Sequence, residues 1–248
     1  ADDGRLVNAK YVRSDYKFGG GGLLGTAEDL ARFGSAHMES GLFSNQSLQD
    51  GLFKAQVRAD GRPVHVGLGW RIGSDPTFGR VFHHSGSLPG ARSVLMVWPD
   101  QGLAVAAMSN TTNTPYNAED FADVLSRIML EAQPAPPTAD PISLDLVFDG
   151  KEGATIRHLV TKAGGTCEGS LQTPAYLKVE LETRGYRAPE SLNVMGSYFK
   201  ANGKLVILAA SRLGLHRVEV DMLSRTGAMV DLDNKFTWSF EQHSFSVR

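Results

Sequence analysis

Residues 82–93, Phe-His-His-Ser-Gly-Ser-Leu-Pro-Gly-Ala-Arg-Ser, lie where two extended segments meet. Their pattern predicts that a strand ends near Phe82, that a tight polar loop follows, and that a long apolar strand begins after Gly90. Apolar runs at 94–98 and 103–108 flank a Pro-Asp-Gln-Gly turn, which predicts an antiparallel pair buried on both faces. The polar triplet at 84–86, at the mouth of this pair, is a candidate site, and a solvated loop is the alternative.

Composition limits the classes of function. The chain has 248 residues, 42% hydrophobic and 21% charged, enough for one large or two modest globular domains. A net charge of -2 gives no basic excess, so we expect no nucleic-acid partner. No apolar run approaches the roughly 20 residues of a membrane-spanning helix, so we expect no membrane span. Cys167 is the single cysteine, which excludes an intrachain disulfide.

The beginning of the chain shows neither an initiating methionine nor an apolar leader. We therefore expect a processed product or a fragment. Four consecutive glycines follow at 19–22, and they fit either a flexible connector or a close backbone approach to a ligand.

Capping signals predict the helices. Thr26, with Asp29 three residues later, forms a capping box at the start of one helix. Ser44 or Asn45 is expected to cap a second helix, and residues 64–72 read as a strand. A further helix follows Asn117, with an expected apolar face of Phe121, Val124, Leu125, Ile128 and Met129.

A proline-rich stretch at 134–140 predicts a stiff linker and a domain boundary. Residues 1–133 then form one domain, and residues 141–248 form a small antiparallel β domain, either a sandwich or a barrel. Alternating apolar residues at 176–182 predict a strand. An Asn-Gly pair within 198–208 predicts a hairpin.

Several chemistries find little support in the residues. The sequence has no His-Glu-x-x-His and no cysteine cluster, and adjacent His83 and His84 on a strand point to opposite faces, so we expect no metal and no cofactor. The Gly-x-Ser-x-Gly elbow is absent. Ser-x-x-Lys occurs at Ser14 and at Ser197, but neither segment reads as the helix that would bring lysine to serine.

Three ordered motifs carry a resemblance to a known family. They are Gly-Gly-Gly-Leu-Leu-Gly-Thr-Ala-Glu-Asp-Leu-Ala-Arg-Phe at 20–33, Gly-Leu-Gly-Trp at 67–70, and His-Ser-Gly-Ser-Leu-Pro-Gly at 84–90. Together the motifs resemble the C-terminal half of serine β-lactamase-like proteins, the superfamily of class C β-lactamases, carboxylesterases and D-Ala-D-Ala peptidases, over about residues 16–131. The resemblance implies an α+β fold: the C-terminal part of a β-lactamase or transpeptidase-like domain, an antiparallel sheet with packed helices, followed here by the small all-β domain.

The resemblance also implies roles for the site residues. His84, Ser85 and Gly86 match the family's third motif on the strand beside the nucleophile. His84 would orient substrate, Ser85 would hydrogen-bond it, and Gly86 would let the acyl group lie against the strand. The backbone N–H of Ser87 would donate to the oxyanion. Arg92 is a candidate for binding substrate charge, and a surface role is the alternative.

One departure limits the expected activity. The family's Ser-x-x-Lys nucleophile and Tyr-x-Asn motif precede the glycine run, and this sequence contains no Tyr-x-Asn. We therefore expect the parent protein to be a serine hydrolase acting on an ester, amide or β-lactam through an acyl-enzyme. Its nucleophile-bearing half would be absent here, and this chain alone would be inactive. The expected partners are a small-molecule or peptide substrate and the missing N-terminal half, and the resemblance suggests a bacterial periplasmic or secreted location.

Two alternatives remain from the sequence. The chain can be a non-catalytic cell-wall or peptide-binding protein of the same fold. The β domain can bind carbohydrate through Tyr176, Tyr186, Tyr198 and Trp238, although core packing is the commoner use of such aromatic residues.

Overall fold

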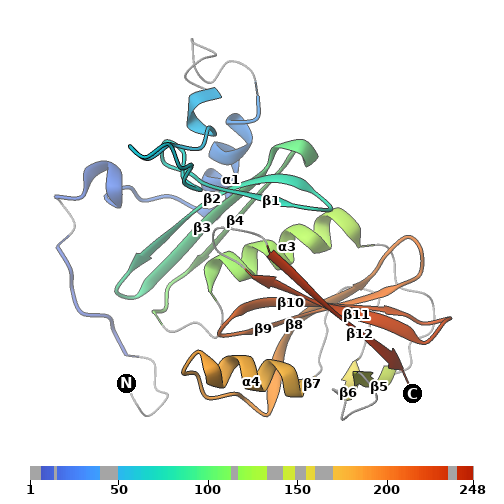
Figure 1. The fold of residues 1–248 in the computed structure, drawn as a ribbon. Coiled ribbons are helices and arrows are strands. Elements are labelled where there is room, and N and C mark those ends of the chain that lie inside the picture. The colour runs from blue at the N-terminus through green and yellow to red at the C-terminus, as the bar shows by residue number, and fades with distance from the viewer. Residues whose placement is uncertain are drawn as a thin grey trace. The chain divides into compact units, whose positions relative to one another are not determined.

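The fold is α+β, with antiparallel sheets and a few helices (Figure 1). A computed structural model describes residues 7–13, 16–39, 50–112, 117–132, 142–148, 155–159, 170–233 and 239–247. The chain divides into two compact units, residues 1–123 and 124–248, and each is considered by itself.

The first unit contains a four-stranded antiparallel sheet in the order β1-β2-β3-β4. Its strands are β1 (Arg71–Asp75), β2 (Gly79–Leu88), β3 (Ala91–Trp98) and β4 (Leu103–Ser109), and the short 3-10 helix η2 (Pro99–Gln101) joins the last two. The predicted antiparallel pairing of β3 with β4 is confirmed, and residues 94–98 of β3 are all buried. The predicted burial of both faces is wrong for β4, which is mostly half-buried and whose Met108 is 46% exposed. Gly90 and Gly102 turn the chain with positive φ angles of 79° and 64°, where a side chain would be strained.

Helix α1 (Ala27–Ala36) packs on this sheet, as Figure 1 shows. The predicted capping box is confirmed: the Asp29 N–H donates to Thr26 Oγ1 at 3.1 Å, and the Thr26 N–H donates to Asp29 Oδ2 at 3.1 Å. The helix lies so close to β3 that a Cβ on Gly34 would sit 2.8 Å from a methyl carbon of Leu95. The core beneath it contains Trp70, Phe82, Leu95 and Val97. A 3-10 helix, η1 (Phe18–Gly20), precedes α1.

Two further predictions for this unit are wrong. The polar loop predicted after Phe82 is strand, because β2 continues to Leu88 and pairs with β3 as far as Ala91. The strand predicted at 64–72 is reduced to isolated bridges at Val57–Pro63 and Val66–Arg71 before β1 begins. The predicted caps at Ser44 and Asn45 lie outside the described residues.

The second unit is a closed eight-stranded antiparallel barrel, one of the two β architectures expected. Each strand pairs with the next in sequence, and β12 closes the barrel against β5. The predicted Asn-Gly hairpin is confirmed, since the Lys200 N–H donates to the Lys204 carbonyl and Gly203 has φ of 77°. The strands are β5 (Ile142–Phe148), β6 (Thr155–Leu159), β7 (Ser170–Gln172), β8 (Ser191–Phe199), β9 (Leu205–Ser211), β10 (Gly214–Asp221), β11 (Thr226–Asp233) and β12 (Ser239–Val247).

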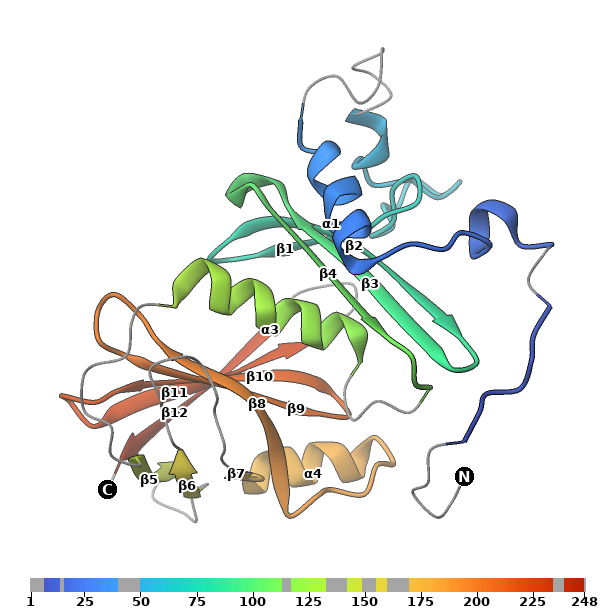
Figure 2. The same cartoon turned by 180° about the vertical axis from the view of Figure 1, so that it is seen from behind.

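Alternate residues of the barrel strands belong to different cores. Leu205, Ile207 and Ala209 of β9 pack inside the barrel, whereas Val206 and Leu208 pack outside it. The outer core includes the C-terminal half of α3 (Ala118–Glu131), which packs against the outer face of the barrel strands (Figure 2). The face predicted for α3 is partly wrong, because Val124 is buried but Phe121 and Met129 are 44% and 65% exposed.

Helix α4 (Ala175–Thr183) replaces the strand predicted at 176–182. Leu177 and Leu181 lie one helical turn apart and are buried in the barrel core, whereas Val179 between them is 63% exposed. The alternation in the sequence fits both periods over so short a segment. Pro174 at the N-cap position favours the helical outcome, because proline is tolerated where no intrahelical N–H bond is made.

The proposed linker at 134–140 lies outside the described residues, so the domain division into 1–133 and 141–248 stays a prediction. Within the part of the chain that the structure describes, no helix has the length and apolarity required to cross a membrane.

Candidate functional site

The candidate site lies on the half of β2 that β1 does not cover. β1 pairs with β2 from Gly79 to His83, and its last partner there is Arg71. On the other side, β3 pairs with β2 as far as Leu88. No described strand continues the β1 side beyond His83, so residues 84–88 form an open strand edge beside a complete ladder.

The orientation of β1 fixes which peptide groups face β2. The Ile72 N–H donates to the His65 carbonyl at 3.0 Å, and the Gly67 N–H donates to the Trp70 carbonyl at 2.7 Å. Trp70 and Ile72 therefore direct their peptide groups away from β2. Peptide groups alternate between the two edges of a strand, so Arg71 directs its own toward β2.

The same alternation runs along β2. His83 is the ladder partner of Arg71, so its N–H and C=O point to the β1 side. The register with β3 is continuous from Phe82 to Leu88, with no bulge. Ser85 and Ser87 therefore present their N–H and C=O groups at the open edge, whereas Gly86 directs its own toward β3.

Side chains alternate between the two faces of β2. His84 is exposed and His83 is only 7% exposed, which confirms that the adjacent imidazoles diverge. Ser87 is exposed and Ser85 is half-buried. The site therefore offers an imidazole on one face, two hydroxyls on the other, and free peptide groups along the edge between them.

Gly86 is required by its neighbour on β3. A Cβ at position 86 would lie 2.5 Å from Ser93 Oγ, well inside contact distance. Any larger residue must displace the Ser93 side chain or the strand. The glycine therefore keeps the two strands close beneath the open edge.

Burial governs the chemistry of His83. The pKa of its imidazole is lowered to about 4, mainly by loss of hydration. Glu119 opposes this shift, whereas the charges of Arg71 and His84 add to it. Its Nδ1 atom has no hydrogen-bond partner in the described parts of the chain. Arg71 pairs with Glu119 at 3.5 Å, a contact that sequence patterns did not reveal. His83 is therefore a neutral group behind the site strand.

Arg92 closes the turn between β2 and β3. Its Nη1 donates to the carbonyls of Leu88 and Ala91, each at 2.9 Å. The Gly90 N–H of the same turn donates to Thr112 Oγ1 at 2.6 Å. In the structure, Arg92 therefore stabilises the turn through these hydrogen bonds. A role for Arg92 in binding substrate charge stays a prediction.

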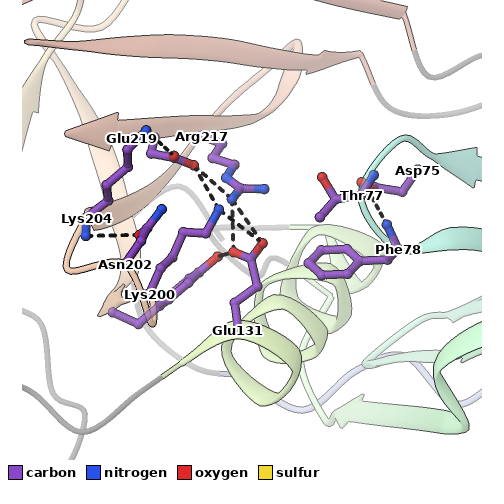
Figure 3. Close-up of polar contacts among 10 residues, drawn as sticks. Asp75, Thr77, Phe78, Glu131, Lys200, Asn202, Lys204, Arg217 and Glu219 are labelled. Atoms are coloured by element: carbon purple, nitrogen blue, oxygen red, sulfur yellow. Dashed lines mark hydrogen bonds and ion pairs between the residues drawn. The ribbon is translucent and has the colours of Figure 1, made fainter. Parts of the chain in front are cut away.

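The opposite end of β2 is fixed by two carboxylates. Asp75 Oδ1 accepts the N–H groups of Thr77 at 2.7 Å and Phe78 at 3.1 Å, as Figure 3 shows for this turn. Asp100 accepts from the Arg80 backbone N–H at 2.8 Å and from its guanidinium at 2.6 Å. Hydrogen bonding to Arg80 holds the pKa of Asp100 below its usual value.

The Ser-x-x-Lys candidates gain no support as nucleophiles. Ser197 lies on strand β8, as expected for a non-helical segment, and Ser14 lies outside the described residues. Among the residues with described side chains, no group of three or more His, Cys, Asp or Glu is arranged to hold a metal ion.

The barrel carries an ion cluster that sequence patterns did not reveal (Figure 3). Arg217 Nη2 donates to both oxygens of Glu131, at 3.1 and 2.9 Å, and to Glu219 at 3.1 Å. The Tyr198 hydroxyl also donates to Glu131. Lys200 and Lys204 approach Glu219 at 3.4 and 3.3 Å.

Burial shapes the titration of this cluster. It raises the pKa of the Tyr198 hydroxyl, which remains protonated as a donor. Burial also raises the pKa of Glu219, but the charges of Lys200 and Arg217 outweigh that effect and the net shift is downward. Tyr198 is 5% exposed, so it cannot contribute to the carbohydrate-binding surface considered from the sequence. Trp238 lies outside the described residues.

The first half of the chain matches a known protein family. The family model described as Beta-lactamase matches residues 1–127, just over half of the chain. The chain belongs to the β-lactamase family. The predicted serine β-lactamase-like resemblance is confirmed, and the match includes the whole of the site strand β2.

Curated relatives agree with the family. The human serine beta-lactamase-like protein LACTB, mitochondrial, is 33% identical over 121 residues, which is 39% of this chain and 22% of that protein. Its bovine counterpart is 31% identical over 130 residues, 43% of this chain and 23% of that protein. This family member thus spans less than a quarter of the length of the curated relatives it matches.

Solved structures show weaker likeness. A structure titled "Crystal structure of SurE with D-Leu" covers 83% of this chain and 48% of that chain, at 17% identity and a TM-score of 0.31. "Crystal structure of SurE" covers 79% and 44%, at 16% identity and the same TM-score. A TM-score this low supports no inference about the fold.

Proposed function

We propose that residues 84–88 of β2 form the acyl-binding strand of a serine hydrolase, which acts on an ester, amide or β-lactam through an acyl-enzyme. The open edge carries this proposal, because it leaves the peptide groups of Ser85 and Ser87 without a strand partner among the described residues. Membership of the β-lactamase family supports a serine hydrolase type of fold. The sheet and α1 would then be the C-terminal part of a β-lactamase or transpeptidase-like domain, and the barrel an appended domain.

The open edge suits a substrate that binds as an added strand. An extended chain laid along residues 84–88 gains main-chain hydrogen bonds from the groups that β1 leaves uncovered. The Ser87 N–H would donate to the carbonyl oxygen of the acyl group, with a second donor from the nucleophile. A donor of this kind contributes about 3 kcal/mol to stabilising the tetrahedral intermediate.

The side chains complete the proposed site. His84 would orient the substrate on its face of the strand, and Ser85 would hydrogen-bond it on the other. Gly86 allows the acyl group to lie against the strand. The attacking serine and the Lys/Tyr pair that moves its proton would come from a segment outside this sequence, so this chain alone is expected to be inactive.

The test uses the protein purified from its source organism. It is mixed with p-nitrophenyl acetate, and intact mass spectrometry follows the acyl-enzyme. We expect His84→Ala to slow acylation about 10²-fold or more while leaving thermal unfolding unchanged, because the residue is exposed. An unchanged acylation rate would show that the motif is wrongly assigned. No acyl-enzyme in the wild-type protein would instead favour the binding-protein alternative.

The mass of the source protein gives a second check. A mass well above 26.8 kDa is expected if a nucleophile-bearing segment belongs to the same polypeptide. A mass equal to that of this chain would require a separate partner chain to complete the site.

A further inference from the structure

The hairpin between β9 and β10 brings a serine and a histidine into hydrogen-bond contact. Ser211 Oγ lies 2.7 Å from His216 Nε2. His216 is 1% exposed, whereas Ser211 is half-buried. The pair therefore combines a sheltered imidazole with a hydroxyl that retains some access from solvent.

Both residues belong to the inner face of the barrel. Val218 and Val220 of β10 pack in the inner core, and His216 follows the same alternation. Ser211 follows Ile207 and Ala209 of β9 in the same way. The contact is thus a diagonal pair on one face of two neighbouring strands.

Nucleophilic serines depend on a base within hydrogen-bond reach. His216 Nε2 meets this condition for Ser211 Oγ, at 2.7 Å.

We propose that Ser211 is a second nucleophilic serine, with His216 as its general base. The proposal is independent of the β2 site. The surrounding inner-face residues, including Ala209, Leu213 and Val218, are apolar. The electrophile is therefore a small activated ester with a short apolar acyl group.

The chemical step is a single displacement. Ser211 Oγ bonds to the carbonyl carbon of the ester, and its proton passes to His216 Nε2. The carbon–oxygen bond to the leaving group breaks, and the leaving alcohol takes the bonding pair and that proton. The products are an acyl-serine and the free alcohol, and His216 is neutral again.

An alkyl fluorophosphonate serves as the probe in the test. Here the Oγ–phosphorus bond forms, the phosphorus–fluorine bond breaks, and fluoride leaves while His216 holds the proton. The full 248-residue chain is treated with the probe, and peptide mapping gives a labelling rate for each serine. We expect Ser211 to react at least about 100-fold faster than Ser224, since general-base assistance contributes 10²–10⁴. Ser224 is an internal control, because it is exposed and its hydroxyl contacts Thr226 Oγ1 at 2.7 Å and the Asp221 carboxylate rather than an imidazole.

Variants separate the nucleophile from its base. Ser211→Ala should abolish the label at that peptide, and His216→Gln should lower the rate to that of Ser224. Equal labelling of Ser211 and Ser224 in the wild-type chain would overturn the proposal without any variant, and so would labelling confined to other serines.

Discussion

His83 carries a pH dependence that the fold imposes on it. Its folded-state pKa of about 4 lies below the ordinary value of 6.5, so the unfolded chain binds the extra proton first. Its contribution to the free energy of unfolding is therefore complete above about pH 6.5 and is lost as the pH falls toward 4. The loss is on the order of 3 kcal/mol, since one unit corresponds to 1.36 kcal/mol.

The first prediction concerns this residue. His83→Leu should flatten the change in unfolding free energy between pH 7 and pH 4.5, because no imidazole remains to take up a proton. Urea unfolding followed by circular dichroism at both pH values measures the effect. His84→Leu is the matched control, since its side chain is exposed, and it should retain the wild-type slope. The same slope in all three proteins would contradict the account of His83.

Gly86 gives a second prediction at the residue scale. Gly86→Val should lower the free energy of unfolding by about 1–3 kcal/mol, the usual cost of overpacking, because its Cβ would meet Ser93 Oγ at 2.5 Å. Adding Ser93→Ala removes the atom that clashes and should recover much of the loss. A double variant as unstable as the single one would show that the close approach does not arise from Ser93.

At the scale of the element, β2 is half interior strand and half edge. Proline removes an N–H donor, which is tolerated only where that group faces no ladder partner. Ser87→Pro should therefore change the thermal midpoint little, whereas Gly86→Pro should destabilise the chain by about 3 kcal/mol because it breaks a bond to β3. Thermal unfolding of both variants tests the assignment of peptide groups to the two edges. The reverse order of stability would contradict that assignment.

The elements also show what the sequence can and cannot predict. The start of α1 was predictable, because the Thr26 and Asp29 cap is a local interaction. The Asn-Gly hairpin was predictable for the same reason. Helix α4 was not, because Leu177 and Leu181 fit both a strand and a helix, and packing inside the barrel selected the helix. The continuation of β2 through 84–88 depends on pairing with β3, which local polarity does not reveal.

At the scale of the whole molecule, the family could be predicted from the sequence, whereas the ion cluster of the barrel could not. Ordered motifs were enough to predict the family resemblance over about residues 16–131, and the family model matches residues 1–127. They also predicted His84 to Ser87 as candidate site residues, which stays a prediction. They did not reveal which peptide groups lie at the open edge, since that depends on where β1 stops. The ion cluster of the barrel joins Glu131 to Arg217, which is 86 positions away, and no local pattern links them.

This cluster gives the prediction for the barrel. Arg217→Met should lower the free energy of unfolding by about 3–5 kcal/mol, because Glu131 would remain buried without its main charge partner. The double variant Glu131→Met with Arg217→Met should be closer to the wild type, since no uncompensated charge remains. Denaturant unfolding of the wild type and the three variants completes the double-mutant cycle. Strictly additive losses would contradict a coupled pair.

The central claim is that the backbone N–H of Ser87 stabilises the oxyanion, and its most direct test compares Ser87→Pro with Ser87→Ala in the protein from its source organism. Proline removes this N–H and alanine keeps it, while both remove the hydroxyl. The measurement is the rate of acyl-enzyme formation with p-nitrophenyl acetate, in variants shown to unfold at the wild-type temperature. We predict a loss of about 10²–10³-fold for Ser87→Pro and a rate near wild type for Ser87→Ala. Equal acylation rates in the two variants would contradict the assignment of β2 as the acyl-binding strand.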